Sequence, residues 1–363
     1  MRGLAASHRK TFIRGLGQNK GAGMTTSFRV ARKRDADRIF SFLKSYWRED
    51  HVFVRNPELM TWQHSAPGSD GLNFVMAEVG TSLVGILGFI PFRSFDPNLP
   101  RDSIALAIWK RTDEAERGTG LRMLTWLREE LAPSNIIAIN LNPATRPIYE
   151  SLGFKTGMMD QYVIFNTDLA FSKVTGQRVS HPDRLGSGLE LLSHNQELSA
   201  RIAEGLEELL RLNCPEKSIS YYLHRFQEHP WFKYEFVTMG QGNTPVLLLV
   251  LRRIQVGESS ILRVVDIAGE VERMPESATV LSDLLSKSES EYIDILAHGL
   301  EEMEMIQGGF QSREASPDLL IPNYYDPFER RNIDVLFAYH SKNTESGPFH
   351  LHPADSDQDR PNR

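Results

Sequence analysis

Apolar residues in the first part of the chain alternate between a strand-like and a helix-like period. Residues 27–31 (SFRVA) predict a short strand. The apolar positions Ile39, Leu43 and Tyr46 predict a helix, which Asp35 would cap. Further elements are expected as a helix at 55–63, a hairpin at 73–79 and 83–92, a strand at 103–109, a helix at 121–131, a strand at 135–141, a helix at 142–152 and a closing strand at 162–165. This order predicts an α/β (α+β) fold, in which helices flank a mixed central sheet.

The second part of the chain repeats this order of elements. Tyr292 stands 156 residues after Ile136, and Phe310 stands at the same offset from Phe154. The matching elements are expected at 189–192, 195–212, 217–226, 236–239, 246–254, 260–267 and 292–297. An internal duplication explains this register. The alternative is a pair of unrelated α/β domains whose elements happen to follow one another in the same order.

The repeat suggests how the chain is divided. We expect a leader at 1–26, a first domain at 27–165, a linker at 166–187, a second domain at 188–341 and a tail at 342–363. Residues 1–23 carry five basic residues and no acidic one. They are interpreted either as a disordered or artefactual leader before a start at Met24, or as a transit peptide.

Composition narrows the possible partners. A length of 363 residues favours two domains, and a net charge of -6 gives no reason to expect a nucleic-acid partner. No apolar run reaches about 18 residues, so no membrane span is expected. Cys214 is the single cysteine, which favours a reducing compartment and a cytoplasmic location.

Residues 116–124 (ERGTGLRML) place two glycines between a predicted strand and a predicted helix. Glycine lets the backbone turn with positive φ, and the free N–H groups at a helix start suit a diphosphate. The spacing matches neither a nucleotide P-loop nor Gly-x-Gly-x-x-Gly, because no Gly-Lys-Ser/Thr and no third glycine follows. An ordinary glycine-rich turn before a helix is the other interpretation.

Two motifs give the chain a family resemblance. Residues 117–122 (RGTGLR) are similar to the Gln/Arg-x-x-Gly-x-Gly/Ala signature of the GCN5-related N-acetyltransferase (GNAT) superfamily, although Arg122 departs from the small last residue. Residues 142–154 (NPATRPIYESLGF) resemble the second signature, in which an Asn precedes a helix that carries a Tyr. The resemblance covers about residues 27–165 and implies two tandem GNAT-like domains.

The resemblance implies a binding site for acyl-CoA, most simply acetyl-CoA, as a co-substrate. The pantetheine arm would pair with the backbone of residues 108–110, and the amides of residues 118–122 would hold the diphosphate. Tyr149 would act as general acid toward the CoA thiolate, which is reasonable for a phenol with a pKa near 10. Its other interpretation is a half-buried helix aromatic. The predicted CoA-binding residues are Ile108, Trp109, Lys110, Arg117, Gly118, Thr119, Gly120, Leu121, Arg122 and Asn142.

A general base is harder to assign, because residues 103–109 contain no acid and no histidine. The candidates are Asp102, Glu78, Asp96 and His64, each of which is also explained as a solvated surface group. A base is dispensable if the acceptor amine arrives neutral.

The second half keeps the framework and lacks these chemical groups. At the offset of 156, Gly118-Thr119-Gly120 becomes Met274-Pro275-Glu276, and Tyr149 becomes Met305. Proline has no N–H, and a carboxylate at a helix start repels a phosphate. We therefore expect CoA to bind to the first half only.

The C-terminal residues 350–359 (HLHPADSDQD) are rich in histidine and aspartate. They lack the Gly and final Glu of an EF-hand loop, so we expect a solvated acidic tail and no metal site. The ending DQDRPN (357–362) resembles the C-terminus of tandem acetyltransferase-like proteins associated with surface-polysaccharide synthesis. Aromatic residues between 221 and 236 indicate core packing or, alternatively, a sugar-stacking surface.

Three functions follow from these observations. The first is transfer of an acetyl or short acyl group to a primary amine, with an amino sugar of a surface-polysaccharide precursor as the favoured small-molecule acceptor. The second is the same transfer to an amino acid, a polyamine or a protein amine. The third is a non-catalytic acyl-CoA-binding or scaffold protein, which the missing carboxylate and the departure at Arg122 would explain.

Overall fold

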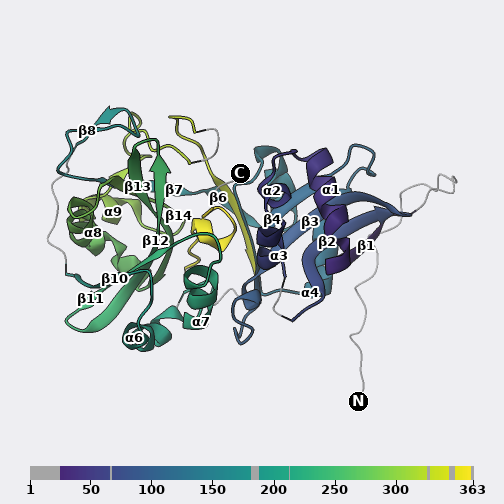
Figure 1. The fold of residues 1–363 in the computed structure, drawn as a ribbon, viewed down its shortest axis with the longest axis horizontal. Helices are drawn as coiled ribbons and strands as arrows, with labels where there is room; N and C mark the ends of the chain where they lie inside the picture. Colours follow the sequence, from purple (N-terminus) through teal and green to yellow (C-terminus); the bar gives the residue numbers. More distant parts are fainter. Residues whose placement is uncertain are drawn as a thin grey trace, which may run out of the picture.

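The computed structural model describes residues 25–65, 68–180, 188–211, 213–324, 328–342 and 348–360. Two seven-stranded mixed sheets dominate this part of the chain, one in each half (Figure 1). The first sheet has the strand order β1-β2-β3-β4-β5-β16-β6, and the second has the order β10-β11-β12-β13-β14-β7-β15. The predicted fold class is confirmed. The predicted leader at 1–26 falls almost wholly outside the described residues.

The first sheet is built from antiparallel neighbours, with one parallel pair at its centre. Strands β4 and β5 form that parallel pair, and their pairing runs from Ser103 opposite Asn135 to Leu106 opposite Ala138. The strands are β1 (Ser27–Arg32), β2 (Gly71–Val79), β3 (Ser82–Pro91), β4 (Ser103–Arg111), β5 (Asn135–Ile139), β6 (Lys155–Met158) and β16 (Leu336–Ser341).

Helices cover both faces of the first sheet. Residues of α1 to α3 share one buried cluster with the sheet, and residues of α4 and α5 share another on the opposite face. The predicted second helix is divided at Asn56, whose side chain caps the helix that follows it. The helices are α1 (Ala36–Tyr46), α2 (Val52–Arg55), α3 (Pro57–Gln63), α4 (Thr119–Leu131) and α5 (Arg146–Ser151).

The second sheet repeats the arrangement, again with one parallel pair, β13 and β14. Its strands are β7 (Asp160–Phe165), β10 (Glu190–Asn195), β11 (Glu235–Gln241), β12 (Thr244–Val256), β13 (Ser259–Gly269), β14 (Ser290–Ala297) and β15 (Gln311–Ser312). Its helices are α6 (Ala200–Leu210), α7 (Ile219–Tyr222), α8 (Ala278–Ser286) and α9 (Glu302–Gly308). None of the helices in the described ranges is both long and apolar enough to cross a membrane.

Each sheet contains one strand from the other half of the chain. Strand β7 was predicted to close the first unit, but it pairs with β14, with Tyr292 opposite Phe165. Strand β16, from the end of the second half, lies between β5 and β6. This exchange corrects the predicted place of residues 162–165. A cut anywhere between 166 and 187 would separate each sheet from one of its strands.

Part of the predicted linker is also structured. Strands β8 (Phe171–Ser172) and β9 (Gln177–Arg178) form a small hairpin. The Ser172 hydroxyl donates to a carboxylate oxygen of Glu291 on β14 at 2.6 Å, so the hairpin is attached to the second sheet. Residues 181–187 of the predicted linker lie outside the described part of the chain.

Candidate acyl-CoA site

A cavity opens where the central parallel strands of the first sheet separate. Pairing between β4 and β5 ends at Leu106 and Ala138, whereas β3 follows β4 as far as Arg111. Backbone groups on the β5 side of β4 therefore face the opening beyond Leu106. The cavity has a volume of about 750 Å³. Its lining comes from β4, β5, the start of α4, the helix α5 and Trp47 at the end of α1.

Most of the residues predicted to bind CoA meet at this cavity. Thr119 and Arg122 are the two predicted residues that lie outside the lining, and Tyr149, the predicted acid, lies within it. The predicted residues in the lining are Ile108, Trp109, Lys110, Arg117, Gly118, Gly120, Leu121 and Asn142. Their roles toward CoA stay predictions.

The glycine turn is shaped by its backbone and by one neighbouring side chain. Gly118 precedes α4 with a φ of 88°, a left-handed conformation that favours glycine. A Cβ atom on Gly120 would lie 3.1 Å from the indole nitrogen of Trp109, so a larger residue would push the ring. The Thr119 amide donates to the Glu116 carbonyl at 3.0 Å, and the two glycines leave the start of α4 without a side chain at those positions, which suits a bound anion.

Positive charge in the lining comes from Lys110, Arg111 and Arg117, and no acidic residue is found among the described lining residues. Arg122 points elsewhere. Its guanidinium forms an ion pair with Glu116 at 2.6 Å and lies over the ring of Phe28. The departure from the family pattern therefore leaves the cavity open.

Tyr149 is buried on α5 between two aromatic rings. Its ring meets Trp109 edge to face at 5.6 Å between centroids and meets Phe154 at 5.2 Å. Burial raises the pKa of the Tyr149 phenol well above its usual range. No described residue forms a hydrogen bond with its hydroxyl group. The phenol therefore keeps its proton at neutral pH.

Two asparagines follow β5. The Asn142 side chain accepts a hydrogen bond from the amide of Ala144 at 3.0 Å and so caps the short 3-10 helix before α5. Asn140 has a φ of 64° and also lines the cavity. Sequence reasoning missed Asn140 and Trp47. A positive-φ asparagine at a strand end has a weak sequence signal, and Trp47 is far from either motif.

The proposed general bases lie away from this cavity. His64 is buried and hydrogen-bonded to the Phe89 carbonyl, and burial lowers its pKa to about 4. Glu78 forms ion pairs with Arg29 and Arg38, and Asp96 accepts a hydrogen bond from the Ser218 hydroxyl at 2.5 Å.

Asp102 precedes β4 at the end of the strand opposite the cavity, and burial raises the pKa of its carboxyl group. None of the four candidates is among the described lining residues. The structure therefore brings the predicted acid and the predicted CoA loop together, but not a predicted base.

The matching region of the second half has a different structure. Residues Val271–Ser277 form a 3-10 helix in place of the glycine turn, and Arg273 pairs with Glu276 at 2.6 Å. A Cβ atom on Gly308 would lie 2.4 Å from the Pro275 carbonyl oxygen, so α9 packs directly against this helix. Met305 is fully buried on α9. In the second half, side chains and backbone fill the region that corresponds to the glycine turn and the cavity of the first half.

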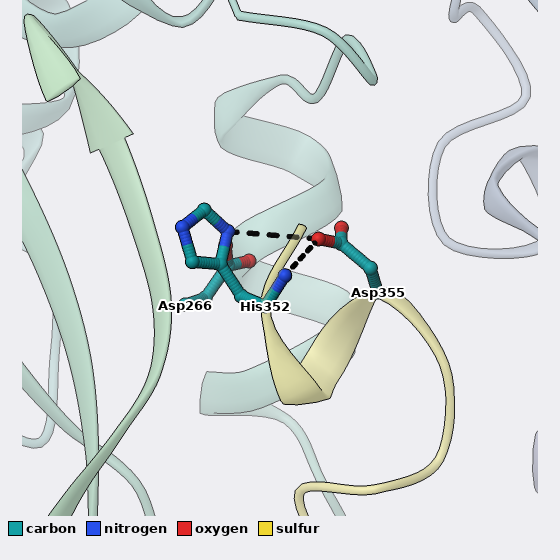
Figure 2. A group of neighbouring side chains, drawn as sticks. All are labelled: Asp266, His352 and Asp355. Carbon is teal, nitrogen blue, oxygen red and sulfur yellow. Dashed lines mark hydrogen bonds and ion pairs between the residues drawn. The ribbon is translucent and has the colours of Figure 1, made fainter. Parts of the chain in front are cut away.

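The histidine- and aspartate-rich C-terminal residues are buried, so the predicted solvated tail is wrong. Asp266, His352 and Asp355 have potential metal-ligating atoms within 4.8 Å of one another. Figure 2 shows these side chains, with His352 and Asp355 joined by dashed lines. The ammonium of Lys217 lies 2.7 Å from both Asp266 and Asp355, where it supplies the positive charge that a metal ion would bring.

The two carboxylates of this cluster control its protonation. Burial by itself favours neutral amine and imidazole groups. Asp266 and Asp355 overcome this effect and raise the pKa of Lys217 and of His352 above their usual values. The cluster is therefore a buried ion network that joins β13 to the C-terminal residues.

Comparison with known proteins agrees with this geometry at the level of fold. A GCN5-related N-acetyltransferase from Anabaena variabilis matches with a TM-score of 0.53 at 11% identity, over 88% of this chain and 73% of that protein. The chain has the GNAT fold in tandem. No protein-family model and no curated protein matches its sequence.

Two more distant structures are also similar. A conserved protein of unknown function from Enterococcus faecalis has a TM-score of 0.49 at 10% identity, over 87% of this chain and 72% of that one. Saccharomyces cerevisiae N-myristoyltransferase with bound myristoyl-CoA has a TM-score of 0.45 at 12% identity, over 91% of this chain and 84% of that protein.

Proposed function

We propose that the chain is an acyl-CoA-dependent N-acyltransferase that transfers an acetyl or short acyl group to a primary amine. The observation that carries this proposal is the cavity between β4 and β5, which combines a glycine turn at a helix start, basic groups and Tyr149. The GNAT fold of the Anabaena protein, an N-acetyltransferase by name, supports it.

The open edge of β4 would bind the pantetheine arm as an added strand does, through the backbone of residues 108–110. The amides of residues 118–122 would face the diphosphate. Those of Thr119 and Arg122 already donate to the carbonyls of Glu116 and Gly118, so Gly118, Gly120 and Leu121 would donate to it, and the helix dipole favours an anion there. Lys110, Arg111 and Arg117 line the same cavity and would add charge-assisted hydrogen bonds to phosphate oxygens.

In the transfer step, the amine nitrogen would form a bond to the thioester carbon as the carbon–sulfur bond breaks. Tyr149 would give its proton to the departing thiolate, the amine would lose one proton to water, and that water would return a proton to the Tyr149 phenolate. The amine would arrive neutral, because no predicted base lines the cavity. We favour an amino sugar as acceptor, and an amino acid, a polyamine or a protein amine is the alternative.

The test is release of thiol from acetyl-CoA in the presence of an amino sugar, an amino acid, a polyamine or a lysine-containing peptide. We expect turnover with one class, and a loss of about 10²-fold or more in kcat for Tyr149→Phe, as for other general acids. Phenylalanine keeps the packing against Trp109 and Phe154, so the CoA dissociation constant should stay unchanged. Tight CoA binding without turnover on any amine would instead favour the scaffold function.

A further inference from the structure

The last described residues, Phe349–Arg360, form what we call the C-terminal segment. It runs between the two halves of the molecule, where its short 3-10 helix is the yellow element near the centre of Figure 1. It begins with bridges from Phe349 to Cys214 and from Leu351 to His298. From Leu351 to Arg360 every residue is buried except Gln358, which is half-buried.

The second half holds this segment through buried charges. Asp359 accepts a hydrogen bond from Arg225 at 2.8 Å and another from the hydroxyl of Tyr234 at 2.6 Å. Lys217 holds Asp355 in the same way, as described above. Breaking such buried pairs leaves a charge without compensation, so the segment has one strongly preferred position.

The first half receives the other end of the segment. The guanidinium of Arg360 donates to the Gln63 side chain at 2.9 Å and lies over the ring of Phe53 at 4.9 Å. Gln63 ends α3 and Phe53 lies in α2, so the segment docks on the face of the sheet that α1 to α3 cover. The CoA loop and Tyr149 belong to the opposite face, with α4 and α5.

Gln358 joins the segment to the cavity. Its carbonyl oxygen accepts a hydrogen bond from the side chain of Asn140 at 3.0 Å, and its amide donates to Asp357 at 2.8 Å. Asp357 in turn pairs with Arg360 at 2.6 Å. A continuous set of hydrogen bonds thus leads from a residue of the cavity lining, Asn140, to the docking contact with α3.

We propose that the C-terminal segment, whose described residues lie outside the cavity lining but adjoin it through Asn140, completes the acceptor-binding wall of the first-half cavity, and that Gln358 determines acceptor specificity by contacting the amine substrate and orienting Asn140. The inference rests on the proposed function. If CoA occupies the α4 and α5 side, the amine reaches the thioester from the side of Trp47, Asn140 and Gln358. The second half then serves the reaction by holding the segment in place.

The first test is affinity labelling of Gln358→Cys with bromoacetyl-CoA. The cysteine sulfur would displace bromide from the CH2 carbon of the bromoacetyl group, forming a thioether and releasing bromide and a proton. The native Cys214 is buried, so the unmodified chain gives the background. Ser341→Cys is the matched control. Ser341 is half-buried, as Gln358 is, and it lies on β16 opposite Asn135, at the end of β5 that is far from the cavity.

We expect bromoacetyl-CoA to label Gln358→Cys at least about tenfold faster than bromoacetamide does, and free CoA to slow it, whereas Ser341→Cys shows neither effect. If calorimetry shows that CoA binds but Gln358→Cys is labelled equally by both reagents and is not protected, this inference is wrong and the proposed function stands. If CoA does not bind, both fail.

The second test separates positioning from folding. Gln358→Met keeps the size of the side chain and loses its hydrogen bonds. With the amine that the chain acylates, we expect the acceptor KM to rise about tenfold, the effect of one lost polar contact, while the KM for acetyl-CoA stays unchanged. Equal changes in both KM values, or none in either, would contradict a role in acceptor binding.

Discussion

At the scale of single residues, the candidate site depends on where two side chains point. Tyr149 lines the cavity and is buried between the rings of Trp109 and Phe154. Arg122 stands five residues beyond Arg117, close to the same turn, yet its guanidinium is committed to Glu116. Neighbours in sequence therefore differ in what they can contribute to binding an anion.

We predict that Arg122→Ala leaves the CoA dissociation constant within about twofold, because the charge removed is already paired outside the cavity. Arg117→Ala is the matched control. It removes a charge from the lining and should weaken CoA binding about tenfold. Calorimetry at low salt measures both, and a large loss for Arg122→Ala would show that its guanidinium turns to the ligand on binding.

At the scale of elements, the two halves have corresponding strand orders, but the region beside the central parallel pair differs between them. In the first half the central strands part around a cavity, and a glycine starts the next helix. In the second half a 3-10 helix containing Pro275 fills that position, and the buried network around Lys217 ties β13 to the C-terminal segment. Among its described residues, the second half thus has no cavity at the matching place and contacts the C-terminal segment instead.

We predict one CoA per chain. At the matching helix start Pro275 has no N–H, and the carboxylate of Glu276 would repel a diphosphate. Titration calorimetry measures the stoichiometry, and the Arg117→Ala variant should weaken the single site without revealing another. Two sites of equal affinity would contradict this reading of the second half.

At the scale of the whole molecule, exchanged strands and the C-terminal segment make the two halves interdependent. Each sheet needs a strand from the other half, and the segment carries buried ion pairs to residues more than a hundred positions earlier in the chain. The proposed division into a first domain at 27–165 and a second at 188–341 thus describes the repeat in the sequence. It does not describe two pieces that close their own sheets.

A chain split between residues 180 and 188 should test this interdependence. We expect the two pieces to co-purify when expressed together, and the first piece alone to aggregate, because loss of β16 leaves β5 and β6 without their shared partner. Size-exclusion chromatography with circular dichroism measures the outcome. A folded, monomeric first piece would show that the exchange is not required.

Stability should fall as the pH is lowered below about 6.5. Burial lowers the pKa of several histidines, to about 4 for three of them and about 3 for the fourth. The unfolded chain then takes up protons that the folded chain cannot, at a cost of about 1.4 kcal/mol per histidine for each pH unit. The residues are His51, His64, His229 and His350.

Urea unfolding at a series of pH values measures this effect, and His51→Gln should reduce the slope by one proton. His352 contributes to the pH dependence of stability with the opposite sign. Its pKa is raised, so the stability it contributes is complete below 6.5 and is lost as the pH rises through its folded value. A stability that does not change between pH 5 and 6.5 would contradict the burial of the four neutral histidines.

The sequence by itself determined the local elements and the position of the candidate site. Apolar periodicity located most strands and helices of both halves, since burial of one face needs a regular spacing. The sequence predicted the glycine turn before α4 and the helix with Tyr149, because backbone conformation and side-chain chemistry require those residue types. Most of these residues meet at one cavity in the structure.

Only the tertiary structure decided which sheet each closing strand joins and where the C-terminal segment goes. The sequence of an apolar strand such as β7 does not show which sheet it will join, because the backbone hydrogen bonds are the same in either sheet. The charges of the segment looked solvated because their partners, Lys217 and Arg225, lie far away in sequence. Pairing between distant residues is what made their burial possible.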